Sequence, residues 1–455
     1  MALVLDVDTA PGTAAAPYVP VPRAEHLPER LTITLWDFTW FVRSGPGEPF
    51  EDLDRAAREA VERGYNTVRI CAMPFLLFRS GLDTSAVELD RLGGDYAQGV
   101  RWYDVQAPTR FDGREKLLEL FRACREAGLF VILSSWEYQQ TSSFSTTPDW
   151  WDALRAIAPE DRPTVLADAL ADMVDFLEEH GLADRIAFTE LHNEVATGHL
   201  MQGLPSVGED EQAAMAGLEP RLAAGLRRFH ERRPDQPVTV NYSRVPIAAM
   251  RFIPREIDVL VVHPYVYGVL DEVTAAFDLR GSLADFPRAA VDAAGLLRDG
   301  APEAMSWVLP PESAWKMDAT IVGKPEIFFH DWVDAAVLDR FLEERYPLHR
   351  VEMDRVLRIW LDVAADHAAA RGIPLVLGEG WIGYTPLHSD FEGGPIGAEY
   401  CRLAMRESRR VGAWGTIVCS NAAPHHPMWA DVPLQVECNE IFTVGAPMAS
   451  PVPGR

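Results

Sequence analysis

The chain has 455 residues, 48% of them hydrophobic, and a formal net charge of −26 from 42 basic and 68 acidic residues. Nucleic acids and anionic membranes bind basic patches, so this charge argues against both as partners. The length exceeds the roughly 250 residues of a minimal eight-stranded α/β barrel and leaves room for long loops. We therefore expect a large folded core and neutral or cationic ligands.

The N-terminal residues 1–21 lack the basic start and compact apolar run of a secretory leader. No stretch of about 18 apolar residues suggests a membrane span. Five cysteines occur without a C-x-x-C pair or an even-numbered framework, and no cluster of side chains has the spacing of a metal site. We expect a cytoplasmic protein, in a reducing compartment, that uses no metal or cofactor.

A repeated strand-then-helix pattern follows an Ala- and Pro-rich arm over 1–30. The predicted strands are 31–41, 65–74, 129–137, 186–195, 237–242, 257–267, 374–379 and 413–420. The predicted helices are 50–63, 114–127, 163–180, 210–233, 350–371 and 396–411, with a loop over 75–113. Apolar strands that alternate with helices indicate a parallel sheet. Eight such units favour an α/β fold of the (β/α)8 TIM-barrel type over the alternative, a doubly wound open sheet.

One long segment, 269–349, interrupts this pattern after the sixth strand and is rich in Trp, Phe and Pro. Structureless loops of this length are uncommon, so we expect a folded, lid-like insertion over the barrel mouth. Its aromatic side chains either stack on a ligand or form a local core. The barrel itself is predicted over 31–443, followed by a C-terminal tail over 444–455.

Functional side chains of α/β barrels lie at the C-terminal ends of the strands. The sequence places a mixture of carboxylates, hydrogen-bonding groups and tryptophans there: Trp36, Asp37, Arg69, Trp136, Glu137, Asn193, Glu194, His263, Tyr265, Glu379, Trp381 and Asn421. Indole faces suit the apolar side of a sugar ring, and polar groups suit its hydroxyls. We therefore predict a carbohydrate site, with Trp381 or Trp429 as its floor.

Two glutamates stand out because each follows a buried strand, Glu194 in ELHNE and Glu379 in PLVLGEGW. An unpaired buried charge is costly, so a carboxylate at such a position should face a cleft. Two glutamates that face each other across a bound sugar are the arrangement of a retaining glycosidase.

The pattern resembles glycoside hydrolase clan A, whose barrels include the family 5 cellulases. In that clan an Asn-Glu pair ends the fourth strand, with the Glu as acid/base, and a second Glu ends the seventh strand as nucleophile. Asn193-Glu194 and Glu379 match these places. Val195 departs from the pattern, since many members have proline after the Asn-Glu pair.

The resemblance covers residues 31–443 and includes Arg69 after the second strand and His263-Pro264-Tyr265 after the sixth. It implies a retaining glycosidase that acts on a small oligosaccharide or glycoside. A cellulase-like carbohydrate-binding protein without turnover is the alternative. A lyase or aldolase is a third hypothesis, but its usual strand-end lysine or metal is missing from the sequence.

The implied roles make physical demands on the two glutamates. Glu194 needs a raised pKa so that it can donate a proton, whereas Glu379 must stay ionised, held by Arg69 and a tyrosine hydroxyl. Asn193 would hold the sugar 2-hydroxyl. Arg69 could instead be a structural partner of Asp37 or Glu137.

Other strand-end groups receive structural interpretations. Glu190 should lie deeper in the barrel than Glu194, and His192 should be a satisfied histidine beneath the helices. His425 and His426 are interpreted as a solvated loop pair. For the substrate, we favour an exo-type pocket, narrowed by the 269–349 insertion, over an open cleft.

Overall fold

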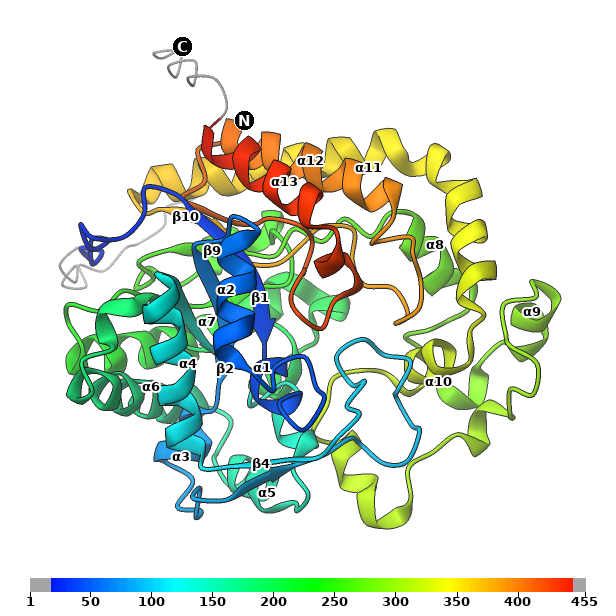
Figure 1. Ribbon diagram of the computed structural model, residues 1–455, viewed down its shortest axis with the longest axis horizontal. Coiled ribbons are helices and arrows are strands. Elements are labelled where there is room, and N and C mark those ends of the chain that lie inside the picture. Colours follow the sequence, from blue (N-terminus) through cyan, green and yellow to red (C-terminus); the bar gives the residue numbers. More distant parts are fainter. Residues whose placement is uncertain (1–17, 445–455) are drawn as a thin grey trace, which may run out of the picture.

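A computed structural model describes residues 18–444 of the chain (Figure 1). Residues 1–17 of the predicted arm and 445–455 of the predicted tail lie outside the described part. Within residues 18–444, no helix is both long enough and apolar enough to cross a membrane. All five cysteines are buried and free.

The centre of the molecule is a ring of parallel strands. They are β1 (Leu31–Asp37), β2 (Thr67–Ala72), β5 (Phe130–Ser135), β6 (Ile186–Glu190), β7 (Val238–Thr239), β8 (Asn241–Tyr242), β9 (Leu260–Val262), β10 (Leu375–Leu377) and β11 (Gly415–Ile417). They pair in the order β7-β6-β5-β2-β1-β11-β10-β9-β8. The two ends of this order, β7 and β8, are halves of one strand interrupted at Val240, so the sheet closes on itself. This topology confirms the predicted (β/α)8 barrel and rules out the open sheet.

Helices surround the ring as expected for strands that are buried on both faces (Figure 1). The outer helices are α2 (Leu53–Glu62), α4 (Gly113–Ala127), α6 (Arg162–Glu179), α7 (Val207–Arg232), α11 (Ala335–Arg371), α12 (Pro395–Arg410) and α13 (Val432–Val444). In α2 the buried side chains recur at helical spacing, at Leu53, Ala56, Ala57 and Ala60. The helix begins at Asp52, whose carboxylate accepts a hydrogen bond from the Arg55 backbone N–H.

The strands end earlier than predicted, because the chain turns directly into functional loops. The predicted strand 31–41 stops at Asp37, which has a left-handed backbone (φ 38°), and a short helix α1 (Thr39–Val42) follows. The predicted loop 75–113 contains helix α3 (Pro74–Phe78) and a hairpin of β3 (Val87–Leu89) and β4 (Thr109–Phe111).

The segment after β9 contains its own helices, α8 (Val269–Ala276), α9 (Arg288–Ala293) and α10 (Lys324–Trp332), on one side of the barrel (Figure 1). Several of its aromatic rings pack on one another: Phe277 stacks on Phe329, Phe286 meets Phe328 edge-on, and Trp307 meets Trp332 edge-on. Of the two uses expected for these aromatics, these pairs form a local core. The expected boundary at residue 349 falls inside α11, which begins at Ala335.

Candidate active site

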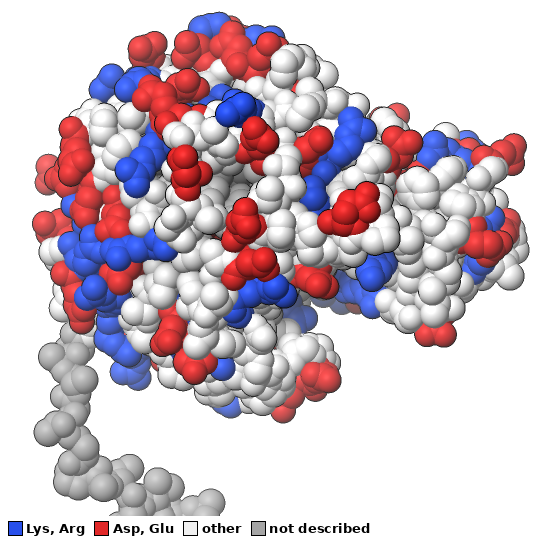
Figure 2. All heavy atoms as spheres, turned by 90° about the horizontal axis from the view of Figure 1, so that it is seen from below, with Lys and Arg blue, Asp and Glu red and all other residues white. Residues whose placement is uncertain are grey.

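A cavity of about 740 Å³ opens at the C-terminal ends of the strands. Its walls come from the loops after β1, β2, β5, β6, β8, β9 and β10 and from helices α7 and α11. Figure 2 shows this side of the molecule, where acidic and basic side chains are interspersed. Six of the predicted site residues line the cavity: Asp37, Trp136, Asn193, Glu194, Tyr265 and Glu379.

 Arg69 is not part of the cavity lining. It is fully buried against the Trp136 ring and donates hydrogen bonds to Glu379 and Asn193.

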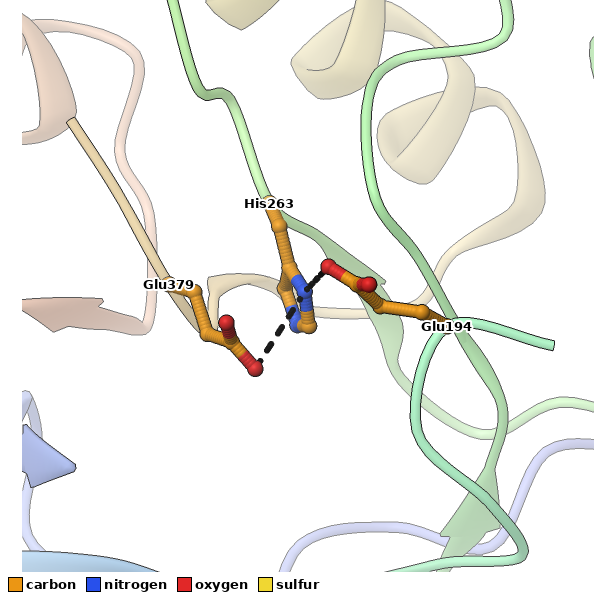
Figure 3. Close-up of side chains that lie close together, drawn as sticks. All are labelled: Glu194, His263 and Glu379. Atoms are coloured by element: carbon orange, nitrogen blue, oxygen red, sulfur yellow. Dashed lines mark hydrogen bonds and ion pairs between the residues drawn. The ribbon is translucent and has the colours of Figure 1, made fainter. Parts of the chain in front are cut away.

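The two glutamates face each other across the His263 ring (Figure 3). His263 Nδ1 lies 2.9 Å from Glu194 Oε1 and 3.5 Å from Glu379 Oε1. One carboxylate oxygen of each glutamate and the imidazole nitrogen all lie within 4.8 Å of one another. The two carboxyl groups, from strands three positions apart in the ring, therefore converge on one small volume.

Glu379 is held by two donors. Arg69 Nη1 donates to its Oε1 at 2.8 Å, and the Tyr265 hydroxyl donates to its Oε2 at 2.6 Å. Asn421 Nδ2 in turn donates to the Tyr265 oxygen at 2.8 Å. Burial raises the pKa of Tyr265 well above its ordinary value, with the Glu379 charge acting in the same direction, so this hydroxyl keeps its proton. Both contacts suit an anionic carboxylate.

Arg69 connects Glu379 to the interior of the barrel. Its Nη2 donates to Glu190 Oε2 and to Asn193 Oδ1, both at 2.7 Å, and Asn241 Nδ2 donates to the same Glu190 oxygen at 2.9 Å. Glu190 is fully buried, and these donors occupy its carboxylate. The sequence offered Asp37 or Glu137 as structural partners of Arg69. In the structure, Arg69 pairs with Glu190 and Glu379 instead.

We expect Arg69→Met to lower the free energy of unfolding by about 3–5 kcal/mol, because it leaves the Glu190 charge buried without its cation. Urea denaturation measures this change. Arg79→Met is the control, since Arg79 pairs with Asp172 at the surface, where such pairs contribute about 1 kcal/mol or less. Equal losses in the two variants would contradict the role of Arg69 as the buried counter-charge.

Glu194 follows β6 in a left-handed backbone conformation (φ 41°), and its backbone N–H donates to Asn241 Oδ1 at 2.5 Å. Non-glycine residues with such a backbone need support from their surroundings. Gln139 Nε2 donates to Glu194 Oε2 at 3.1 Å. Burial raises the pKa of Glu194 to about 7, against the opposing effects of the Arg69 charge and the Gln139 hydrogen bond. Near neutral pH this carboxyl is therefore protonated in a substantial fraction of molecules.

His263 is neutral in this setting, because burial lowers its pKa to about 4. Its Nε2 has no hydrogen-bond partner among the described residues. A buried N–H without an acceptor is costlier than a buried lone pair, so the proton belongs on Nδ1, which donates to Glu194 Oε1. Glu194, His263 and Glu379 are close enough to share a metal ion, but Arg69 already places a positive charge on Glu379.

Two predicted pairs of neighbouring residues divide between the cavity and the surrounding shell, because consecutive strand residues point to opposite faces. Asp37 lines the cavity, whereas Trp36 is buried beside Phe50. Trp136 lines the cavity, whereas Glu137 accepts hydrogen bonds from the first backbone N–H groups of α3 and from Trp150. The predictions of Trp36 and Glu137 as substrate ligands were therefore wrong.

The two tryptophans expected at the floor lie elsewhere. Trp381 is buried and donates from its indole N–H to the Val418 carbonyl at 3.3 Å. Trp429 stacks on Tyr65 and donates to Glu59 of α2, outside the barrel. The loop after β11 carries Trp429 outward to the helical layer, which its position in the sequence did not reveal.

The histidines of the loops also differ in part from expectation. His192 is fully buried, and its Nε2 accepts a hydrogen bond from the Tyr138 backbone N–H, as expected for a satisfied histidine. His425 and His426 are buried rather than solvated. His426 contacts Arg101, whose guanidinium pairs with Glu392 at 2.6 Å. This buried network joins the loops after β2, β10 and β11.

Several residues that line the cavity were not predicted from the sequence. They are Trp102, Gln139, Tyr267, Glu326 and Tyr384. Gln139 had a detectable signal, since it is a polar residue just beyond the third strand. The hydroxyl of Tyr384 donates to Glu326, which α10 of the insertion carries into the cavity. No local pattern predicts that contact between segments 58 residues apart in the chain.

The fold and the paired glutamates define a barrel of the glycoside hydrolase type. A family profile described as sugar-binding cellulase-like matches residues 33–442, and the chain belongs to this cellulase-like family.

Several solved structures are similar to this chain. A candidate glycoside hydrolase from Parabacteroides distasonis ATCC 8503 is 20% identical, with a TM-score of 0.63, over 92% of this chain and 95% of that one. The GH5_18 structure from Streptomyces cattleya in complex with GlcNAc is 12% identical (TM-score 0.47; 93% and 83% covered). The endo-β-1,4-mannanase from Thermotoga petrophila is 11% identical (TM-score 0.45; 92% and 78% covered). A search of curated proteins found no match to this chain.

Proposed function

We propose that the protein is a retaining glycoside hydrolase that cleaves a small oligosaccharide or glycoside, with Glu379 as nucleophile and Glu194 as acid/base. One observation carries the proposal: oxygens of the two carboxyl groups lie within 4.8 Å of each other. Retaining enzymes keep their carboxyl groups about 5–5.5 Å apart, whereas inverting enzymes need about 6.5–9.5 Å to admit a water molecule.

In the first step, Glu379 attacks the anomeric carbon while Glu194 gives its proton to the departing glycosidic oxygen. The bond from the anomeric carbon to that oxygen breaks, and a covalent glycosyl ester forms on Glu379. In the second step, ionised Glu194 removes a proton from water, and the water oxygen attacks the same carbon. The ester bond breaks, Glu379 is again a carboxylate, and the sugar leaves with its original anomeric configuration.

Neighbouring groups support this chemistry. Asn193 uses its Oδ1 for Arg69 and one amide proton for Gln139, which leaves its second amide proton for the sugar 2-hydroxyl. The indole of Trp136 lines the cavity and offers a face for the sugar ring. Buried, free cysteines are consistent with a reducing compartment, and we extend the proposal to a cytoplasmic location.

The stereochemical outcome tests the mechanism. We expect the first product to have the anomeric configuration of the substrate, because two displacements at one carbon restore it. Proton NMR of the anomeric signal, recorded within minutes of mixing enzyme with an activated aryl glycoside, distinguishes the anomers before they equilibrate. Initial formation of the opposite anomer would rule out the double displacement.

The alternative is a sugar-binding protein without turnover, which the description of the matching family also allows. Binding alone does not need two carboxyl groups in contact with one histidine. A wild-type protein that binds sugars but hydrolyses no member of a broad aryl-glycoside panel would favour this alternative.

A further inference from the structure

The mouth of the barrel is crossed by a bridge between two opposite loops. Asp331 of α10 accepts hydrogen bonds from the backbone N–H groups of Ala97 and Gly99, both at 2.6 Å, and Lys316 Nζ donates to the Arg91 carbonyl at 3.0 Å. In Figure 1 the cyan loop after β2 runs beside the yellow-green insertion after β9. These strands are four positions apart in the eight-position ring, so the contact joins opposite sides.

This bridge is closely packed. A Cβ atom built on Gly99 would lie 2.2 Å from the carbonyl oxygen of His330, so the loop backbone approaches α10 as closely as only glycine allows. Tyr103 of the same loop donates to Gln140 Oε1 at 2.9 Å and also contacts Thr320 of the insertion. A groove that ran straight through between these loops would be obstructed here.

The exposed part of the cavity lining is confined to one side of the mouth. Its exposed lining residues are Gly208, Arg244, Asp271, Arg280, Ile321 and Glu352. All of them come from segments that follow β6, β8 or β9, in the half of the mouth that holds Glu194. The described residues that line the cavity after β1, β2, β5 and β10 are buried or half-buried. The cavity therefore opens beside the proposed proton donor and is closed beyond the proposed nucleophile.

Asp37 lies in the closed wall, with 2% of its surface exposed. Its Oδ1 accepts a hydrogen bond from the Thr39 backbone N–H at 2.6 Å, but its Oδ2 has no partner among the described residues. His425 Nε2 is 3.8 Å from Oδ2, beyond hydrogen-bond distance, and has no partner of its own among the described residues. A buried polar atom without a hydrogen-bond partner at a cavity wall is available to hydrogen-bond a ligand.

The protonation of Asp37 suits a sugar hydroxyl. Burial raises its pKa to about 8, against the hydrogen bonds from Thr39, and the Glu379 charge also raises it. Near neutral pH the carboxyl is therefore largely protonated, so it can both donate to and accept from a hydroxyl group.

We propose that the enzyme is exo-acting and removes single sugar residues from the non-reducing end, with the Asp37 carboxyl hydrogen-bonded to a terminal hydroxyl of the sugar that is cleaved off. This inference rests on the proposed glycosidase function. The sugar attacked by Glu379 has its leaving group on the open side, beside Glu194. The closed wall on its other side leaves no room for a preceding sugar residue.

The product pattern tests the exo mode with the wild-type protein. A panel of 4-nitrophenyl monoglycosides identifies the sugar, and the corresponding oligosaccharide, labelled at its reducing end, is then digested. We expect a ladder of labelled products that shorten by one residue at a time from the start of the reaction. Early labelled products of internal cleavage would overturn the inference while leaving the glycosidase function intact. Hydrolysis of no glycoside at all would overturn both.

Asp37→Ala tests the hydroxyl contact, because it removes the side-chain donor and acceptor, whereas asparagine would keep both. We expect kcat/KM to fall by about 10- to 100-fold, as for the loss of one buried hydrogen bond. Wild type should discriminate against at least one singly deoxygenated substrate (3-, 4- or 6-deoxy) by a similar factor, and the variant should lose that discrimination. Asp54→Ala, the same change at an exposed position on α2, should alter neither. Unchanged discrimination in a folded Asp37→Ala protein would show that Asp37 is only structural.

Discussion

Glu379→Gln should lower kcat by about 10⁴- to 10⁶-fold, the range seen when a catalytic nucleophile is removed. Glutamine has the same shape and still accepts a hydrogen bond from Tyr265, but its amide cannot form the glycosyl ester. Arg69 keeps Glu190 as its anionic partner, so the fold should persist. Steady-state rates with an activated aryl glycoside, together with circular dichroism, measure both effects.

Covalent labelling locates the same residue directly. In a 2-deoxy-2-fluoro glycoside the fluorine slows both the formation and the hydrolysis of the glycosyl ester. A good leaving group speeds the formation alone, so the ester accumulates. We expect the intact mass to rise by one fluorosugar in wild type but not in Glu379→Gln, and peptide mapping to find the sugar on Glu379. A label on Glu137 would contradict the assignment, since that carboxylate faces α3 rather than the cavity.

The barrel could be predicted from the sequence because its strands are apolar on both faces, which few other structures require. The strand ends were harder. At Trp36-Asp37 and Trp136-Glu137 the sequence shows two functional residue types in succession, but alternation allows only one of each pair to face the cavity. The left-handed backbone at Asp37 ends β1, and no periodic pattern in the sequence predicts it.

The contacts between distant segments could not be predicted. The bridge between Gly99 and α10 joins residues more than 230 positions apart, and Glu326 reaches the cavity only because the insertion folds over the mouth. Trp429 illustrates the reverse case. It follows a barrel strand, yet its loop returns to α2, where its indole packs on Tyr65.

The pH dependence should identify Glu194 as the acid. Its pKa of about 7 means that kcat/KM of the wild type should fall as the pH rises through 7, because only the protonated carboxyl can donate. Glu194→Gln should lower kcat/KM by about 10²- to 10⁴-fold for glycosides with poor leaving groups. The loss should be much smaller for aryl glycosides whose leaving group needs no proton.

Two other carboxyl groups titrate in the same range and provide the contrast. Burial raises the pKa of Glu137 to about 7 and that of Asp37 to about 8. Measured with a glycoside whose leaving group needs a proton, the fall in kcat/KM near pH 7 should disappear from the residual activity of Glu194→Gln. It should persist in Glu137→Gln, because Glu137 titrates in the same range but faces α3 rather than the cavity. Persistence of the fall in Glu194→Gln would assign the proton donor to another group. Glu194 and Glu379 both lie against His263. If the fall persisted in Glu194→Gln, this close approach of the two carboxyl groups would have no catalytic explanation.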